Sequence, residues 1–298
     1  MKPQSRIFCF GEVLWDVFPD NSRIGGAPLN VATKLATFGH QVFMVSAVGR
    51  DKEGDEILEF LEERNVISKF VKTHPELSTG KVLVQLDEEG KASYQIVHPV
   101  AWDDITVNKI DMEEMGHIDL LVFGSLACRD KRSRRGLQLL MEQAEFKVLD
   151  INLRAPHYQY ELLIDMMQKA DFVKFNDEEI IEISRELGRT GDFENLAREL
   201  ARQFQIDAVC VTLGEDGAIL LYQGKYFHHP GFKVQVRDTV GAGDSFLATI
   251  LNELLSGNDP KSALTKACAM GAMVASKDGA NPEILSTELF NFLQDADI

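Results

Sequence analysis

The sequence has no excess of positive charge and no long apolar run, and each absence excludes a class of protein. Its 31 lysines and arginines are outnumbered by 47 aspartates and glutamates, which gives a formal net charge of −16. Nucleic acids need a basic footprint on the protein that binds them, so we expect no nucleic-acid partner. Because no run of about 18 apolar residues occurs, we expect no membrane-spanning helix and no membrane partner.

Closely spaced cysteines are also missing. The four cysteines are far apart and form no C-x-x-C pair: Cys9, Cys128, Cys210 and Cys268. This pattern disfavours disulfide scaffolds and zinc knuckles, and it predicts buried free thiols. The first residues, MKPQSRIFCFGEVLWD, are interrupted by Glu12 and contain no clear cleavage site for a signal peptide. The sequence therefore predicts a cytoplasmic protein.

Apolar strand-like runs alternate with longer helical patterns along most of the chain. The strand-like runs lie at 6–13, 41–49, 119–125, 146–152, 172–176 and 208–214, and helical patterns such as 27–39 and 55–65 lie between them. This alternation favours parallel strands joined by right-handed crossovers. We expect a single α/β domain over residues 1–298, with a doubly wound, mostly parallel sheet flanked by helices.

Residues 68–98 interrupt the alternation. They contain three short strand-like runs, KFVKT, GKVLVQLD and KASYQIVH, the last two joined by the turn EEG at 88–90. A small antiparallel sheet that projects from an α/β body often serves as a lid, and we assign residues 15–25 and 68–104 to such an insertion. Pairing with a second copy of the chain would satisfy the unpaired backbone groups at its exposed edges, which predicts a homodimer through the lid.

The stretch 238–246, DTVGAGDSF, places glycines and a carboxylate between a strand-like run and a helical pattern. A glycine turn at a helix start is suited to binding an anion, because free N–H groups and the helix dipole point at the ligand. It is not a P-loop, and Phe246 stands where a dinucleotide-binding fingerprint would need its third glycine. An ordinary turn with an aspartate as helix cap is the alternative.

Two stretches together resemble a known family. DTVGAGDSF resembles the C-terminal signature of the ribokinase-like (PfkB) carbohydrate kinases, and GGAPLNVATKLATFG followed by VSAVGRDKEG resembles their N-terminal signature. The order of the elements and the early lid also agree, so the resemblance spans nearly the whole chain. It implies a ribokinase-like fold, transfer of a phosphoryl group from ATP to a sugar hydroxyl, and a requirement for Mg²⁺.

The resemblance assigns the transfer chemistry to the helix start at 241–244. Gly241, Ala242 and Gly243 would form an anion hole for the γ-phosphate. Asp244 would be the general base that accepts the proton of the attacking hydroxyl. The base must adjoin the cradle because the attacking oxygen loses its proton beside the phosphate.

The resemblance also implies a sugar site. Asp16 would accept hydrogen bonds from neighbouring sugar hydroxyls, although an aspartate at a strand end is often a simple turn former. The other implied sugar-binding residues are Gly25, Gly26, Asn30, Ala101, Trp102 and Arg154. An ordinary helix start with proline near its first position is the alternative for 25–30.

The implied nucleotide-binding residues are Asn176, Thr212, Gly214, Gly217 and Gly243. Asn176 and Glu179 match the family's N-x-x-E motif and would position Mg²⁺ through water, but they are also spaced as a helix capping box. A glycine-bearing hairpin is the alternative for 212–217. In many members of the family, residues matching Asp238, Val240 and Gly279 hold a monovalent cation such as K⁺.

Within the family, GEVLWD, GGAPLNVA and YQIVHPVAWDDI most resemble the bacterial fructokinase branch, which implies conversion of D-fructose to fructose 6-phosphate. Kinases of ribose, 2-keto-3-deoxygluconate, tagatose or nucleosides stay open as alternatives.

A sugar-binding regulator without catalysis would be expected to lose Asp244 or an anion-hole glycine, and both are present. A nicotinamide oxidoreductase is disfavoured because no G-x-G-x-x-G follows the first strand. Arg50 and Arg237 depart from the signatures, but outside the implied base and anion hole.

Overall fold

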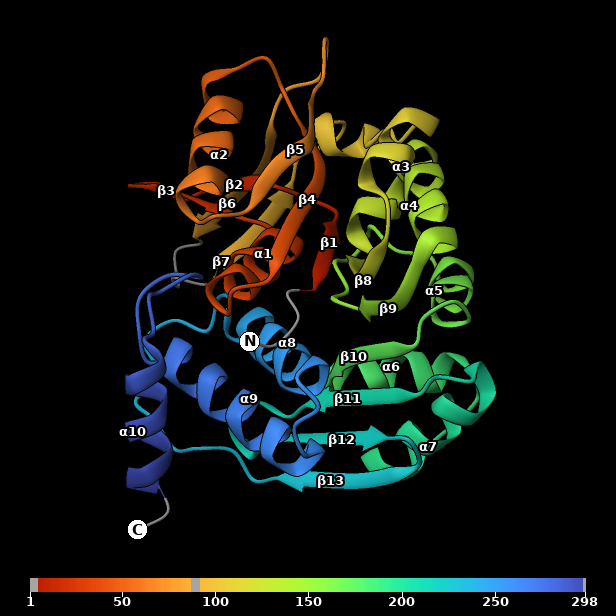
Figure 1. Ribbon diagram of the computed structural model, residues 1–298, viewed down its shortest axis with the longest axis vertical. Coiled ribbons are helices and arrows are strands. Elements are labelled where there is room, and N and C mark those ends of the chain that lie inside the picture. The colour runs from red at the N-terminus through yellow and green to blue at the C-terminus, as the bar shows by residue number, and fades with distance from the viewer. Residues whose placement is uncertain (1–4, 87–91, 297–298) are drawn as a thin grey trace. The chain divides into compact units, whose positions relative to one another are not determined.

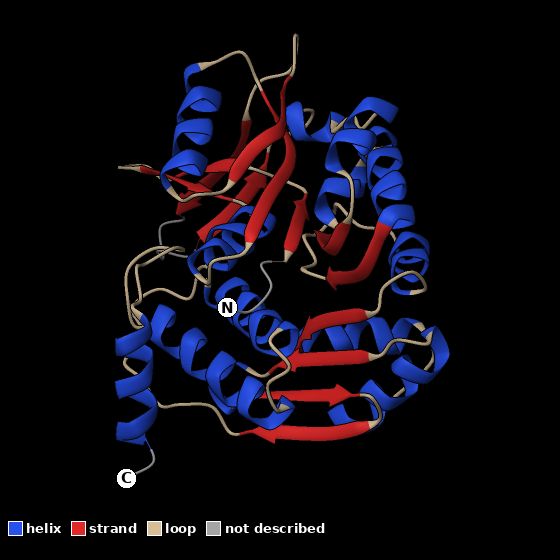
Figure 2. Cartoon of the chain, viewed as in Figure 1, coloured by secondary structure: helices blue, strands red, loops and turns tan. Residues whose placement is uncertain are grey.

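The computed structural model describes residues 5–86 and 92–296, so the predicted EEG turn at 88–90 lies outside the described residues. The chain divides into two compact units, an N-terminal unit (Gln4–Glu145) and a C-terminal unit (Phe146–Ile298). Both units combine helices with strands (Figures 1 and 2). Within the described ranges, no helix is long and apolar enough to cross a lipid bilayer.

The N-terminal unit is built on four parallel strands in the order β8-β1-β4-β5. The strands are β1 (Arg6–Phe10), β4 (Gln41–Val48), β5 (Ile67–Thr73) and β8 (Ile118–Gly124), and the helices are α1 (Ala27–Thr37), α2 (Lys52–Glu63), α3 (Lys109–Met115) and α4 (Lys131–Gln143). Continuous apolar runs form these strands because both faces of the sheet are covered; Ile7, Phe8, Cys9 and Phe10 are fully buried.

A small mixed sheet lies in the same unit, in the order β3-β2-β6-β7. Its strands are β2 (Leu14–Val17), β3 (Ser22–Gly25), β6 (Gly80–Leu86) and β7 (Ala92–Ile96), and two short 3₁₀ helices follow, η1 (Ala101–Asp104) and η2 (Leu126–Arg129). Residues 68–73, which we assigned to this sheet, instead belong to β5 and pair in parallel with β4. Tertiary packing explains the difference, because the ring of Phe70 lies 6.0 Å from that of Phe8 and 5.9 Å from that of Phe43.

The C-terminal unit holds three parallel strands, β9, β10 and β11, followed by the antiparallel strands β12 and β13. Their bounds are β9 (Ala144–Asp150, which begins at the unit boundary), β10 (Phe172–Asn176), β11 (Ala208–Thr212), β12 (Ala218–Tyr222) and β13 (Lys225–His229). The remaining elements are α5 (Tyr160–Met167), α6 (Asp177–Glu186), α7 (Phe193–Phe204), η3 (Gly214–Asp216), α8 (Ala242–Leu255), α9 (Pro260–Ala275) and α10 (Ser286–Ala296). Helices α8 and α9 pack side by side (Figure 1). The predicted α/β class with mostly parallel strands and a small additional sheet is confirmed.

Candidate active site

The DTVGAGDSF stretch forms the start of α8. Gly241 is the N-cap residue and has left-handed backbone angles, φ 76° and ψ −5°. Ala242, Gly243 and Asp244 occupy the first turn, where N–H groups have no acceptor within the helix, and the Ala242 N–H donates to the carbonyl oxygen of Thr239 at 3.2 Å. A left-handed N-cap favours glycine. A β carbon on Gly241 would also lie 2.1 Å from the carbonyl oxygen of Ala280.

The three residues predicted to hold a monovalent cation lie together beside this turn. The carboxylate of Asp238 accepts a hydrogen bond from the Val240 N–H at 3.0 Å and another from the Gly279 N–H at 3.2 Å. The bond from Gly279 ties the segment after α9 to the segment before α8. Arg237, which departs from the family signature, has its guanidinium 3.6 Å from the Asp278 carboxylate on an exposed part of the surface. Cation binding by Asp238, Val240 and Gly279 stays a prediction.

The predicted capping box at the start of α6 is confirmed. Asn176 Oδ1 accepts from the Glu179 N–H at 2.7 Å, and Glu179 Oε2 accepts from the Asn176 N–H at 2.8 Å. The other carboxylate oxygen of Glu179 accepts from the Leu153 N–H at 2.8 Å. Burial raises the pKa of Glu179, although the nearby Lys174 and these backbone N–H groups oppose the increase. Both oxygens of this buried carboxylate are thus held in place by backbone N–H groups. Positioning of Mg²⁺ by Glu179 stays a prediction.

Sequence reasoning missed a buried ion pair close to α8. Lys174 on β10 is 7% exposed, and its Nζ lies 2.8 Å from Oδ1 of Asp150, the last residue of β9. Nζ is also 3.7 Å from the point where a β carbon on Gly243 would lie. The available signal was a single lysine in the run FVKF of β10, whose other three residues are apolar.

The predicted nucleotide loop is the connection between β11 and β12. These strands pair in an antiparallel manner with Thr212 opposite Ala218, so the alternative interpretation as a glycine-bearing hairpin is confirmed. Gly214 and Gly217 both have positive φ, and a β carbon on Gly217 would lie 2.0 Å from the carbonyl oxygen of His229. This contact accounts for Gly217 without a ligand, and nucleotide binding by the loop stays a prediction.

Arg154 follows β9 on the segment whose Leu153 N–H reaches Glu179. Its side chain is exposed, and one guanidinium N–H donates to the carbonyl oxygen of Leu153 at 2.9 Å. Arg154 therefore lies in the C-terminal unit with Asp244, whereas the other predicted sugar-binding residues lie in the N-terminal unit.

Asp16 and Gly25 lie together in the small sheet. Asp16 is in the middle of β2 and not at a turn, which contradicts the turn-former alternative; it is opposite Arg23 in the register with β3. A β carbon on Gly25 would lie 2.6 Å from Asp16 Oδ2, and one on Gly26 would lie 2.4 Å from the carbonyl oxygen of Glu12. Both glycines are thus required by close approach, and Gly26 is also the N-cap of α1 with φ 118°.

Asn30 is buried in α1 at 5% exposure, and Ala101 and Trp102 in η1 are fully buried. Trp102 contributes to packing, because the Arg129 guanidinium lies 4.1 Å from its ring centre. The same guanidinium binds both oxygens of Asp103, at 2.6 and 2.9 Å. Burial and pairing give 101–103 a structural function, and contact with sugar stays a prediction for Ala101 and Trp102.

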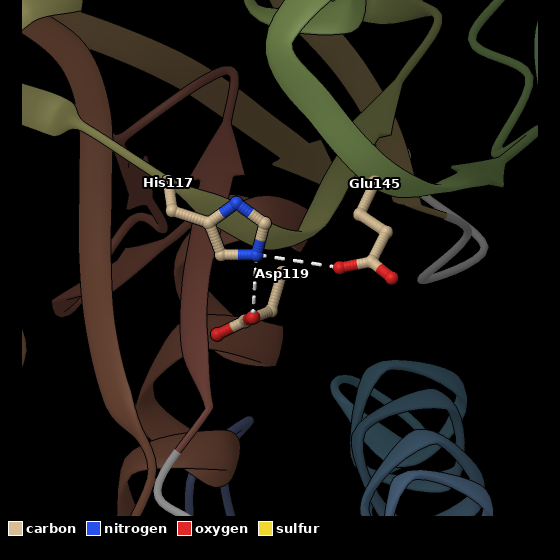
Figure 3. Close-up of side chains that lie close together, drawn as sticks. All are labelled: His117, Asp119 and Glu145. Atoms are coloured by element: carbon tan, nitrogen blue, oxygen red, sulfur yellow. Dashed lines mark ion pairs between the residues drawn. The ribbon is translucent and has the colours of Figure 1, made fainter.

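Figure 3 shows a separate group of polar side chains in the N-terminal unit: His117, Asp119 and Glu145. His117 Nε2 lies 3.0 Å from Asp119 Oδ1 and 3.3 Å from Glu145 Oε2. One imidazole and two carboxylates are ligands that Zn²⁺ accepts. However, the side chains of His117 and Glu145 are 60% and 71% exposed, and both contacts have the spacing of surface ion pairs. We therefore treat the group as a surface ion-pair cluster.

Comparison with known proteins places this arrangement in a family. The profile of the pfkB family carbohydrate kinases matches residues 3–287. Aminoimidazole riboside kinase of Salmonella typhimurium is 27% identical over 300 residues, covering 94% of this chain and 92% of that protein. Fructokinase of Escherichia coli is 29% identical over 267 residues, covering 85% of each chain.

Solved structures agree with the sequence comparison. The crystal structure of fructokinase from Vibrio cholerae O395 in its fructose, ADP and calcium ion bound form has a TM-score of 0.84 at 25% identity, covering 97% of this chain and 99% of that one. Since the family profile covers nearly the whole chain, and the two signature segments form the starts of α1 and α8, this chain belongs to the pfkB family of carbohydrate kinases and is a phosphotransferase of that family.

Proposed function

We propose that the chain is an ATP-dependent fructokinase that converts D-fructose to D-fructose 6-phosphate, with Asp244 as general base. The observation that carries the kinase assignment is the start of α8, where a left-handed glycine precedes the first turn and Asp244 follows within that turn. The choice of fructose is supported by the 29% identity with Escherichia coli fructokinase over 85% of the chain. The resemblance to the fructokinase branch implies that the hydroxyl at position 6 is the acceptor.

In the proposed reaction, the sugar hydroxyl gives its proton to the Asp244 carboxylate and its oxygen forms a bond to the γ-phosphorus of ATP. The bond from that phosphorus to the oxygen bridging to the β-phosphate breaks, and ADP leaves with the electron pair. N–H groups at the start of α8 would stabilise the negative charge on the transferring group, because they are fixed before the reaction begins. Asp16, with Gly25 beside it, would bind sugar hydroxyls.

The donor set at the start of α6 is compatible with Mg²⁺ held through water. Each oxygen of Glu179 accepts one backbone N–H, and a carboxylate oxygen has a further lone pair for a water molecule. The ion would neutralise charge on the phosphates. For K⁺, the meeting of Asp238, Val240 and Gly279 supports a site close to the α8 turn.

Aminoimidazole riboside is the competing substrate with a specific observation in its favour, namely 27% identity with the Salmonella kinase over 94% of the chain. Ribose, 2-keto-3-deoxygluconate and tagatose are further alternatives. A sugar-binding regulator would be a protein of a different class, and the intact Asp244 and glycines of the turn count against it.

An ADP-release assay with ATP, Mg²⁺ and each of these sugars tests the proposal. Fructose should give a kcat/KM at least about 10-fold above every competitor, equal to about 1.4 kcal/mol in transition-state binding. A higher value for another sugar would change the substrate and leave the kinase assignment intact. Absence of turnover with every sugar, by a protein that binds ATP, would favour the regulator.

We also propose a homodimer formed through the small sheet. The strands β3 and β7 are its edges, and Tyr94 on β7 is 64% exposed. Exposed strand edges readily pair with another copy. Light scattering at micromolar concentration should give a dimer mass, and Tyr94→Lys should weaken the dimer. A monomer of the unmodified protein at that concentration would reject the proposal.

A further inference from the structure

The charged pair Lys174–Asp150 is a poor way to join two strands if stability is its only purpose. Lys174 is 7% exposed and Asp150 is 4% exposed. Taking two charges out of water costs about as much as their attraction returns, and apolar residues of similar volume often serve equally well. Asp150 Oδ2 is also buried without a hydrogen bond from any residue in the described ranges. A costly pair at this position indicates a function for the charge itself.

The surroundings of the ammonium identify what that charge acts on. Gly243 is the second residue of α8, and the point at which its β carbon would stand is 3.7 Å from Nζ and 3.9 Å from Cε of Lys174. Since residue 243 has no side chain, no methyl group separates the ammonium from the turn. The start of α8 thus has a buried cation directly beside its backbone.

Charged and titratable groups from four neighbouring elements surround Lys174. They are Asp150 on β9, Glu179 on α6, Cys210 on β11 and Asp244 on α8. Burial alone would lower the pKa of Lys174, but attraction by Asp150, Glu179 and Asp244 outweighs it, so the pKa lies above its usual value. Lys174 therefore carries its full charge at neutral pH.

We propose that Lys174 is a positioning residue whose ammonium, fixed by Asp150, supplies positive charge to the anion-binding turn at the start of α8. This inference rests on the proposed function, since it takes the γ-phosphate of ATP as the anion. The ammonium acts through the turn on the transferring phosphoryl group. Without the ammonium, the three carboxylates that surround Lys174 would repel that group. In a site of low dielectric such repulsion is strong.

A lysine that supplies charge to the turn and a lysine that only joins two strands should differ in their effects on ATP and ADP binding. ATP carries the γ-phosphate and ADP lacks it, so removal of the ammonium should weaken ATP binding more than ADP binding. It should also lower kcat, because charge accumulates on the transferring group in the transition state. A pair that only joins β9 to β10 would change the unfolding temperature and leave the ratio of the two affinities as it was.

The test uses the full chain and four proteins. These are the unmodified protein, Lys174→Met, the double variant Lys174→Met/Asp150→Leu, and Lys147→Met as control. The double variant removes both charges and leaves no unpaired carboxylate at 150. The control breaks another lysine–aspartate pair of the same unit, in which Lys147 Nζ lies 2.9 Å from Asp171 Oδ2. Calorimetry gives the dissociation constants of ATP and ADP, and thermal unfolding reports folding.

In the double variant we expect the ratio of ATP to ADP affinity and kcat each to fall by about 10- to 100-fold, less than or comparable to the loss of a direct oxyanion donor. The control should match the unmodified protein in both. A folded double variant with an unchanged affinity ratio and unchanged kcat would overturn the proposal. Failure of both Lys174 variants to fold would also reject it, because the pair would then be needed for the structure.

Failure of the proposed function gives a different result. In that case the unmodified protein would transfer phosphate to no sugar of the panel. The affinity ratio, which needs no sugar, would still report whether Lys174 acts on the γ-phosphate.

Discussion

Gly25 lies so close to Asp16 that a β carbon at residue 25 would be 2.6 Å from the Asp16 carboxylate oxygen Oδ2. The carboxylate can keep its position only if residue 25 has no side chain. Both Asp16→Ala and Gly25→Ala should therefore damage sugar use, the first by removing the carboxylate and the second by displacing it. Loss of hydrogen bonds to a charged group costs about 1.5–3 kcal/mol, so kcat/KM for fructose should fall by about 10- to 100-fold. The KM for ATP should change little.

Gly39→Ala is the control for this pair. Gly39 also has a positive φ, 86°, but a β carbon there would contact nothing within 4 Å. The substitution introduces backbone strain without touching a side chain. It should lower the unfolding temperature and leave the KM for fructose unchanged. Sugar kinetics that are normal in Asp16→Ala would show that Asp16 does not bind the sugar.

The two glycines of the α8 turn should differ in their tolerance of alanine. At Gly241 the added methyl group would meet the Ala280 carbonyl oxygen at 2.1 Å, on a backbone with φ 76°. At Gly243 the nearest atom is Lys174 Nζ at 3.7 Å, an ordinary contact. Gly241→Ala should thus lose about 1–3 kcal/mol or more in the free energy of unfolding. Gly243→Ala should unfold near the normal temperature; equal losses in the two variants would contradict this geometry.

Gly241 and not Asp244 is the N-cap of α8, and no side chain caps the helix, so the cap alternative for Asp244 is wrong. Asp244→Asn separates a catalytic base from a residue that only stabilises the first turn, because the amide keeps the size of the side chain and one acceptor oxygen. An amide cannot accept the proton, and kcat should fall by roughly 10²- to 10⁴-fold. ATP affinity should hold or improve because a negative charge close to the phosphates is lost. Stability should decrease by about 0.3–1 kcal/mol through the weaker helix-dipole interaction.

Fructose-dependent ADP release, ATP titration and thermal unfolding on one preparation provide the measurement for Asp244→Asn. A folded variant that binds ATP and turns over at a near-normal rate would require a different base.

The Arg129–Asp103 pair should be critical for stability. Its side chains are 5% and 0% exposed, so Arg129→Met would leave a fully buried carboxylate without its cation. The expected cost is about 3–5 kcal/mol in the free energy of unfolding, measured by chemical denaturation. Arg132→Met is the matched control. Arg132 pairs with Asp104 at 2.8 Å with a 49% exposed side chain, and its loss should cost at most about 1 kcal/mol.

The four cysteines should be unreactive in the native protein. All four are buried free thiols, and burial raises the pKa of each, to about 12 for Cys128 and Cys268. The thiolate is the nucleophile, so at pH 8 almost none is present. A thiol reagent should titrate four groups after denaturation and essentially none before it. Rapid labelling of a native thiol would contradict the burial of that residue.

The sequence by itself determined the class of fold and the elements that carry the signatures. Apolar runs such as RIFCF and AVCVT form buried strands of the parallel sheet, because a short continuous apolar run is typical of a strand that is buried on both faces. The glycine, proline and asparagine at 26–30 and the glycines at 241–243 marked the starts of α1 and α8 for the same reason, since helix starts are set by a few neighbouring residues.

Only the tertiary structure decided contacts between residues far apart in the chain. The strand at 68–73 looked like part of an insertion, and the packing of Phe70 against Phe8 and Phe43 placed it on β4. Local pattern cannot state which strand a residue will pair with. Likewise, only the tertiary structure brings the Arg129 guanidinium to 4.1 Å from the ring centre of Trp102, and contact of Trp102 with sugar stays a prediction.

Lys174 shows the same limit at the site. A lysine among apolar residues is visible in the sequence, but its partner Asp150 is 24 residues earlier and Gly243 is far later in the chain. Their meeting depends on the register of β10 with β9 and on where α8 begins. The charge of Lys174 can act on the start of α8 only because tertiary packing brings these distant segments together, and the local sequence does not determine that packing.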